Sequence, residues 1–271
     1  MTRVPRRDTD APHGLGAGLS IALGFGMLWV PLGQHEFLLS HWMKVGTFMA
    51  PLLLLMAFAF RGPRNLGLDP QFLGLLVLLA YIAHQFEEHW IDLYGNVFAF
   101  QASVNGLILN ALGAESGPDG SPEILTRASI FVINTSLVWL VGALAIWRGG
   151  QAIAPVLAMI AIAIVNAVSH IVSAVAMGMY NPGLVTSILV FLPLCVLAYV
   201  SLWRSNQANG PQIGWSLAWS VAAHVIMVVG VIAANWWGAM SEIVYFAVLV
   251  AWSILPTAWS WQRGAAADGT A

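Results

Sequence analysis

A group of ionisable residues near the end of one apolar stretch is the part of this sequence best suited to chemistry. The stretch runs from Gln71 to Asp92, QFLGLLVLLAYIAHQFEEHWID, and its last turns contain His84, Glu87 and Glu88. On a helix, residues three and four positions apart lie on the same face, so these three side chains should converge. Ionisable groups in a transmembrane helix are costly and normally face a protein interior or a water-filled cavity. We therefore predict that this face belongs to a functional site.

Other apolar stretches supply candidate partners for this cluster. Asn166 and His170 share one face of a later stretch, and Asn134 and His224 occur singly in two more. With a rise of about 1.5 Å per residue, all of them fall in the same half of a membrane as the first cluster. We predict that they converge on it, and His170 most directly.

The residue types favour a metal site. Neutral histidine and ionised glutamate are ligands suited to Zn or Fe, so we predict that His84, Glu88 and His170 are metal ligands. Glu87 would then act as the catalytic acid or base on a bound water. Two alternatives stay open: a carboxylate–histidine pair that handles protons, and a hydrogen-bonded pair that only helps helices to pack. Asn134, Asn166 and His224 are predicted to support the site or the substrate.

The composition places the whole chain in a membrane. Of its 271 residues 59% are apolar and only 8% are charged, whereas a soluble domain carries about a quarter charged residues. The net charge of −2 gives no reason to expect a nucleic-acid partner. The single cysteine, Cys195, lies in an apolar run and is expected to be a small buried residue.

The apolar segments and the basic residues together predict the fold. Strand-like alternation is absent, so we expect an all-α, polytopic transmembrane bundle of about eight spans. The expected spans are 15–33, 41–60, 71–92, 128–147, 151–179, 184–203, 214–236 and 238–261. Only Lys44 and Arg127 lie on one side of this arrangement, and the remaining basic residues lie on the other, with both termini. Because basic residues favour the cytoplasm, we predict cytoplasmic termini in a multi-pass protein of the cell membrane, plasma or inner.

The domain organisation follows from these spans. Residues 1–14 are expected to be a cytoplasmic segment, 15–263 a single transmembrane domain, and 264–271 a flexible tail. The long outer loop, 95–127, contains apolar residues at helical spacing, which predicts an amphipathic helix on the outer membrane face. Two roles stay open for it, a cover over the site and a passive interfacial helix. His89 is about 140° around its helix from His84 and is expected to have a surface role.

Several motifs resemble those of the HXXEE-domain family of membrane proteins. They are the His84-x-x-Glu87-Glu88 motif, FVIN ending at Asn134, NAVSHI with Asn166 and His170, and YNPGLVTS beginning at Tyr180. The resemblance covers about residues 70–205, and it departs from the family where members often have Tyr, at His89. It implies that Tyr180 and Thr186 belong to the rim of the site. It does not imply a particular reaction, because the family has no settled activity.

Two functions from different classes fit these residues. The first is a metal-dependent integral-membrane enzyme that hydrolyses or oxidises a lipid or another amphiphile, at a site in the outer half of the bilayer. Membrane lipids and a lipid-like or apolar small molecule are then the expected partners, and the sequence carries no signal for an oligomeric state. The alternative is a proton-coupled transporter or carrier that uses the Glu/His cluster. A membrane assembly factor without a cofactor is a third, weaker hypothesis.

Overall fold

The described part of the chain is helical throughout. The structure is a computed structural model that describes residues 36–61, 69–114 and 123–268. Within these ranges, the β-structure is confined to one isolated bridge between Ile91 and Val97. The expected first span, 15–33, lies outside the described residues, as do the segment 1–14 and most of the loop between Ala114 and Glu123.

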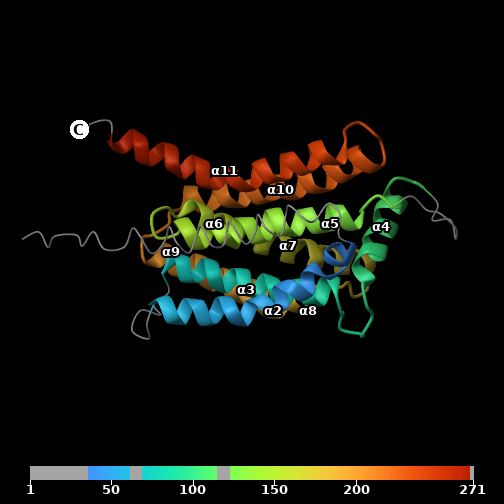
Figure 1. Ribbon diagram of the computed structural model, residues 1–271, viewed down its shortest axis with the longest axis horizontal. Helices are drawn as coiled ribbons and strands as arrows, with labels where there is room; N and C mark the ends of the chain where they lie inside the picture. Colours follow the sequence, from blue (N-terminus) through green and yellow to red (C-terminus); the bar gives the residue numbers. More distant parts are fainter. Residues whose placement is uncertain (1–35, 62–68, 115–122, 269–271) are drawn as a thin grey trace, which may run out of the picture.

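The remaining seven expected spans all correspond to helices, which lie side by side along one long axis (Figure 1). Two of them contain a π-helical turn and are therefore divided. The helices are α2 (Glu36–Arg61), α3 (Pro70–His89), α5 (Arg127–Asn134) with η1 (Thr135–Leu140) and α6 (Val141–Arg148), α7 (Ala154–Met177), α8 (Leu184–Thr186) with η2 (Ser187–Phe191) and α9 (Leu192–Arg204), α10 (Gly210–Asn235) and α11 (Glu242–Asp268).

Local sequence signals set the limits of these helices. Asp69 accepts a hydrogen bond from the backbone N–H of Phe72 at 2.8 Å and caps α3, and Pro70 occupies a first-turn position that needs no donor. Asn209 and Gln212 form a reciprocal capping box at the start of α10. Gly178 ends α7 in a left-handed conformation. Caps and breakers therefore fix where these helices begin and end.

Within the described ranges, five helical segments are long and apolar enough, by length and composition, to cross a membrane: Glu36–Leu55, Arg127–Arg148, Ala154–Met177, Leu184–Arg204 and Gly210–Asn235. The chain is thus a helical membrane protein. The count of eight spans and the cytoplasmic side of the termini stay predictions. The last helix extends to Asp268, past the predicted end of the last span near residue 261, since the alanines after Gly264 favour a helix.

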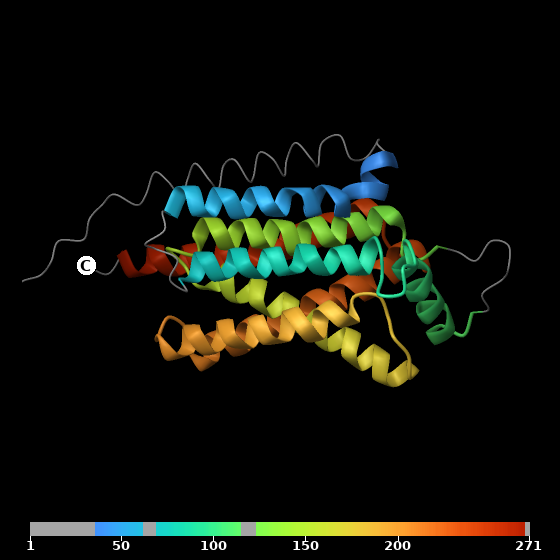
Figure 2. The same ribbon diagram turned by 90° about the horizontal axis from the view of Figure 1, so that it is seen from below.

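α3 and α7 form the centre of the bundle. α3 packs against α2, α6 and α7, and α7 packs in addition against α10 and α9. α4 (Ala99–Ala111) is the exception to the parallel arrangement, because it lies across the end of the bundle where α3 finishes (Figures 1 and 2). The predicted helix in the loop 95–127 is therefore present, and it covers the end that carries the polar cluster.

The two π-helical turns are features that the apolar pattern does not predict. η1 begins directly after Asn134, and η2 begins directly after Thr186. Both turns therefore adjoin residues that the sequence assigns to the site. π-helical turns are rare and occur frequently at functional sites.

Candidate metal centre

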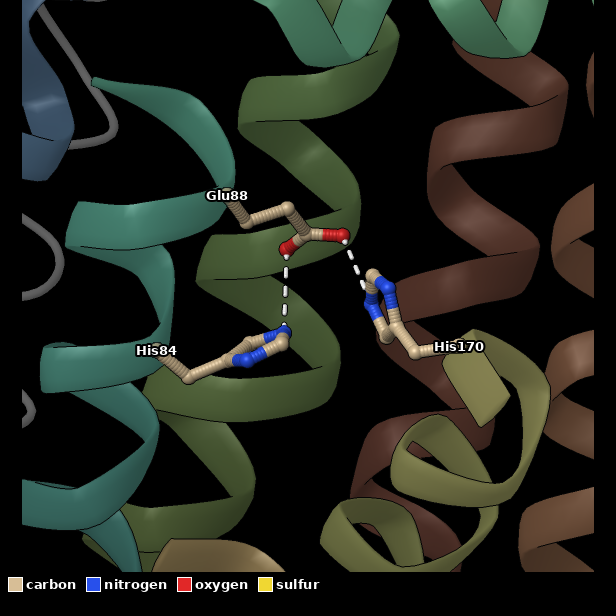
Figure 3. Close-up of side chains that lie close together, drawn as sticks. All are labelled: His84, Glu88 and His170. Atoms are coloured by element: carbon tan, nitrogen blue, oxygen red, sulfur yellow. Dashed lines mark ion pairs between the residues drawn. The ribbon is translucent and has the colours of Figure 1, made fainter. Parts of the chain in front are cut away.

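His84, Glu88 and His170 converge, as the sequence predicts (Figure 3). Glu88 lies one turn after His84 on α3, and its Oε2 is 3.4 Å from His84 Nε2. Its Oε1 is 3.3 Å from Nε2 of His170, which comes from α7. One ligand atom from each of the three lies within 4.8 Å of the other two, and all three side chains are buried. This cluster could bind a metal ion.

The hydrogen bonds of the His84 ring determine which of its two nitrogens carries the proton. Nδ1 of His84 is 2.8 Å from the Thr186 hydroxyl, and that hydroxyl donates its only proton to Glu87 at 2.6 Å. The Thr186 oxygen must therefore accept the proton of His84 Nδ1–H. His84 Nε2 is left with a lone pair, which agrees with the donation to it from the Asn166 amide at 2.9 Å. A metal at this position would take the place of the amide.

His170 is oriented in the same way by Asn181. The Asn181 amide nitrogen donates to the backbone carbonyl of His170 at 2.9 Å, so the Asn181 amide oxygen is left as an acceptor. It is 2.6 Å from His170 Nδ1, which must therefore carry the proton. His170 Nε2, like His84 Nε2, presents a lone pair to Glu88. Hydrogen bonds that fix the tautomer of a histidine in this way are usual around metal ligands.

These assignments leave three Lewis bases facing one another. Two imidazole lone pairs and an ionised carboxylate repel each other unless a cation lies between them. A proton on Glu88 could be donated to only one of the two nitrogens. A divalent metal could be shared by all three groups at once. A second proton on His170 would instead pair that ring with Glu88, and His84 Nε2 would keep the Asn166 amide as its donor.

Glu87 points away from this centre. Its carboxylate accepts hydrogen bonds from the Tyr180 hydroxyl at 3.0 Å, from the backbone N–H of Val185 at 3.1 Å, and from the N–H and hydroxyl of Thr186. Burial, together with the Glu87 carboxylate, raises the pKa of the Tyr180 phenol, so the phenol stays protonated and donates. The expected catalytic role of Glu87 stays a prediction, but these contacts favour a role in holding Thr186 and, through it, His84.

His89 is buried, so its expected surface role is wrong. Its Nε2 is 3.0 Å from Glu88 Oε2, and its ring is only 5% exposed. The error arises because α2, α4 and α5 cover the sides of α3 that a single amphipathic face would leave open. A chain of hydrogen bonds orients the ring: Trp139 donates to Gln85, Gln85 to Asn134, and Asn134 to His89. Asn134 therefore supports the site through His89.

Gly183 brings the loop between α7 and α8 against both histidines. It has a φ of +94°, which favours glycine. A Cβ at this position would lie 2.6 Å from His84 Cε1 and 2.8 Å from His170 Cε1. The absence of a side chain is therefore what allows the two rings to approach Glu88 together.

A cavity of about 300 Å³ opens on this centre. Glu88, His170 and Asn166 contribute polar atoms, whereas most of the lining is apolar and comes from α4, α5, α7 and α10. α4 lies over the cavity with Phe100, Val104, Leu107 and Ile108. His224 also lines it, and its Nδ1 donates to the Ser220 carbonyl at 2.8 Å, which leaves Nε2 as an acceptor.

Comparison with known proteins agrees with the resemblance seen in the motifs. Residues 75–198 match the family described as "Protein of unknown function with HXXEE motif". These residues form an HXXEE region. No curated protein and no solved structure matches the chain.

The HXXEE region contains all of the convergent ligands and several residues that sequence reasoning missed. Asn181 lies within the YNPG motif, which predicts a turn but not a hydrogen bond to His170. Gly183 lies in the same motif. Its positive φ and its close approach to the two histidines are seen only in the structure. Gln85 and His89 flank the paired glutamates without sharing their face. His224 lies outside the HXXEE region but contributes to the same cavity.

Proposed function

We propose that the protein is a metal-dependent integral-membrane enzyme that acts on a lipid or another amphiphile. The observation that carries this proposal is the cluster of three Lewis bases, His84 Nε2, Glu88 and His170 Nε2, two of which, Glu88 and His170, line a largely apolar cavity. A shared cation would satisfy all three groups at once. A structural metal would need no adjoining cavity, whereas a catalytic one needs an open coordination position and room for a substrate.

Two histidines and one carboxylate are compatible with two classes of reaction. The set resembles the three protein ligands of catalytic zinc sites and the facial triads of non-haem iron oxygenases. A bound zinc ion would supply an activated water for hydrolysis, and a bound iron ion would supply oxidation by O2. The identity of the metal therefore decides between hydrolysis and oxidation.

The chain's own residues would position the ligands and exchange a proton. We propose that Glu87 and Thr186 hold the His84 ring in its ligand tautomer, and that Asn181 does the same for His170. His224 lines the cavity, its Nε2 is an acceptor, and it takes no part in the ligand cluster, so we propose it as the proton acceptor.

The substrate class is inferred from the cavity lining. Apolar side chains of α4, α5 and α10 would bind an acyl or similar chain, and the metal centre would meet the polar part of the molecule. With the predicted topology, the cavity lies in the outer half of the cell membrane, beneath the helix α4. A substrate could then enter from the outer leaflet.

Metal analysis of the detergent-purified protein tests this proposal. We expect close to one zinc or iron per chain, and Glu88→Gln or His170→Ala should lower this content by more than about tenfold because each removes a ligand. Glu242→Gln is the matched control, since Glu242 accepts hydrogen bonds from Thr126 and Ser129 away from the ligands. Purified wild type without stoichiometric metal, after expression in metal-supplemented medium, would contradict the proposal.

The alternative is a proton-coupled carrier, and one contact favours it. His170 Nε2 lies 3.3 Å from Glu88, a distance that an imidazolium–carboxylate pair could adopt. A carrier also needs access from both membrane faces, whereas the α4 residues in the cavity lining place the cavity toward the end of the bundle that α4 covers. Metal-free wild type that takes up protons together with a solute would favour this alternative.

A further inference from the structure

A second, smaller cavity adjoins the one at the metal centre. Its volume is about 150 Å³, and it lies between α2, the segment before α4, and the start of α5. His89, Phe100 and Ile130 line both cavities, so the two meet at these three side chains. The rings of His89 and Phe100 are in edge-to-face contact, with centroids 4.7 Å apart. The meeting point is therefore one residue from Glu88.

The smaller cavity differs from the larger one in charge. Arg127 and Ser40 belong to its lining, with the Arg127 guanidinium 3.3 Å from the Ser40 hydroxyl. Lys44 is close by, with its ammonium group 4.8 Å from the centroid of the Trp90 ring and 6.0 Å from that of Phe98, which lines the cavity. Among the described residues, neither cation has a carboxylate within ion-pair distance. Both positive charges are available to a ligand.

The remaining polar groups define where an anion would bind. Gln101 also lines this cavity and donates to the Glu123 carboxylate at 2.7 Å, so a negative charge lies beside that part of the lining. The side formed by Arg127 and Ser40 lies at the first turn of α5, where the helix dipole adds partial positive charge. An anionic group is therefore expected beside Arg127, away from Glu123.

We propose that the substrate is a single-chain amphiphile with an anionic headgroup, such as a carboxylate or a phosphate monoester. This inference rests on the proposed function and specifies its substrate. The headgroup binds to Arg127 and Ser40 in the smaller cavity, and the apolar chain occupies the larger cavity beneath α4. The bond that joins the headgroup to the chain then lies where the two cavities meet, at His89 and Phe100, beside the carboxylate of Glu88. Phe100 must turn aside to admit the chain.

A matched pair of ligands tests the headgroup. The wild type, in nanodiscs of neutral phosphatidylcholine, is titrated with 1-palmitoylglycerol and with 1-palmitoylglycerol 3-phosphate, which differ only in the phosphate. We expect the phosphate to bind at least about fivefold more tightly, with a preference that weakens as salt increases. Arg127→Gln should abolish most of this preference while leaving the affinity for the neutral lipid unchanged. Arg204→Gln, at the other end of the bundle, is the control and should change neither.

Further measurements separate the contribution of the headgroup to binding from that of the acyl chain. Inorganic phosphate should not displace the lipid at equal concentration, because without a chain it gains nothing from the apolar cavity. Leu107→Trp, which fills part of the larger cavity, should weaken both lipids alike. Equal affinity of the wild type for the two lipids, or equal effects of Arg127→Gln and Arg204→Gln, would overturn the inference. His170→Ala should keep the preference for the phosphate, because the headgroup binds at the smaller cavity and not at the metal. If the wild type binds no metal but still prefers the phosphate, the enzyme is contradicted and the binding site is supported.

Discussion

The two halves of the helix pair α3 and α7 both contain buried side chains, but these side chains interact through different forces. In the half nearer the start of each helix, the contacts are between apolar residues such as Leu73 and Val77 of α3 and Leu157 and Ile160 of α7, all at most 1% exposed. In the other half, the same two helices bring His84, Glu88 and His170 into contact at 0–6% exposure. The backbone is helical in both halves, so the difference lies in the side chains.

This comparison shows which half is built for stability and which for a ligand. Burial of apolar side chains stabilises a membrane protein through close packing. Buried charges cost several kcal/mol of desolvation (about 1–4 kcal/mol relative to an apolar replacement) and depend on every partner being present. The polar half is therefore ordered by Thr186, Asn181 and Gly183, which come from outside the two helices that carry the ligands. Changes in the two halves should consequently affect different measurements.

Replacement of Gly183 should have the largest effect on the polar half. Gly183→Ala places a methyl group where two imidazole carbons already lie, and Ala is in addition strained at a φ of +94°. We expect metal affinity to fall by more than about 100-fold because both histidines are displaced. The measurement is a competition titration with a chelator.

Gly178→Ala is the control for this replacement. It also has a positive φ, +64°, but a Cβ there would meet nothing within 4 Å. It should share the backbone strain and keep the metal. If both variants lose metal equally, strain and not contact with the histidines is the cause.

Loss of the hydroxyl at position 186 should have a smaller effect. Thr186→Val keeps the shape of the side chain but removes the acceptor for His84 Nδ1–H and the donor to Glu87. We expect metal affinity to fall by about 10–100-fold, as is typical when an outer hydrogen bond to a ligating histidine is lost. Thr186→Ser should restore it, because the hydroxyl returns. A Val variant with wild-type affinity would show that Glu87 and Thr186 do not position His84.

A cavity in the apolar half should have the smallest effect on the metal. Ile160→Ala removes buried methyl groups and should lower the free energy of unfolding by about 2–5 kcal/mol, measured in mixed micelles of increasing denaturing detergent. Metal affinity at a saturating lipid-to-protein ratio should change by less than about twofold, since Ile160 contacts none of the ligands. A large loss of metal would mean that the two halves are coupled and that the apolar half also contributes to ligand binding.

The sequence predicts the ligands better than their surroundings. The spacing of His84 and Glu88 on one apolar helix is sufficient to predict a shared face, and the depth of His170 predicts its half of the bundle. The apolar segments likewise predict the seven described span-like helices with small errors at their ends. The ligand spacing and the apolar segments both follow helix geometry, which can be recognised in the sequence.

The rest of the site depends on contacts between distant segments. The position of His89 is set by helices that cover the far side of α3, and the direction of Glu87 is set by backbone N–H groups of Val185 and Thr186. Neither contact has a period or a motif. The close approach of Gly183 requires a loop conformation that the letters YNPG allow but do not specify.

The π-helical turns at Thr135–Leu140 and Ser187–Phe191 carry a consequence for how such a site can arise and be lost. A π-helical turn holds one more residue than the α-helical turn it replaces. Deletion of a single codon within Ser187–Phe191 could therefore restore a regular helix without unfolding it. Because the shorter turn would absorb the missing residue, the helical segments on either side would keep nearly the same orientation. The side chains within the turn would shift by one position instead, and among them Phe191 packs on the His84 ring with centroids 4.5 Å apart. Descendants of this chain could in this way change the surroundings of the centre in one genetic step and keep the membrane fold.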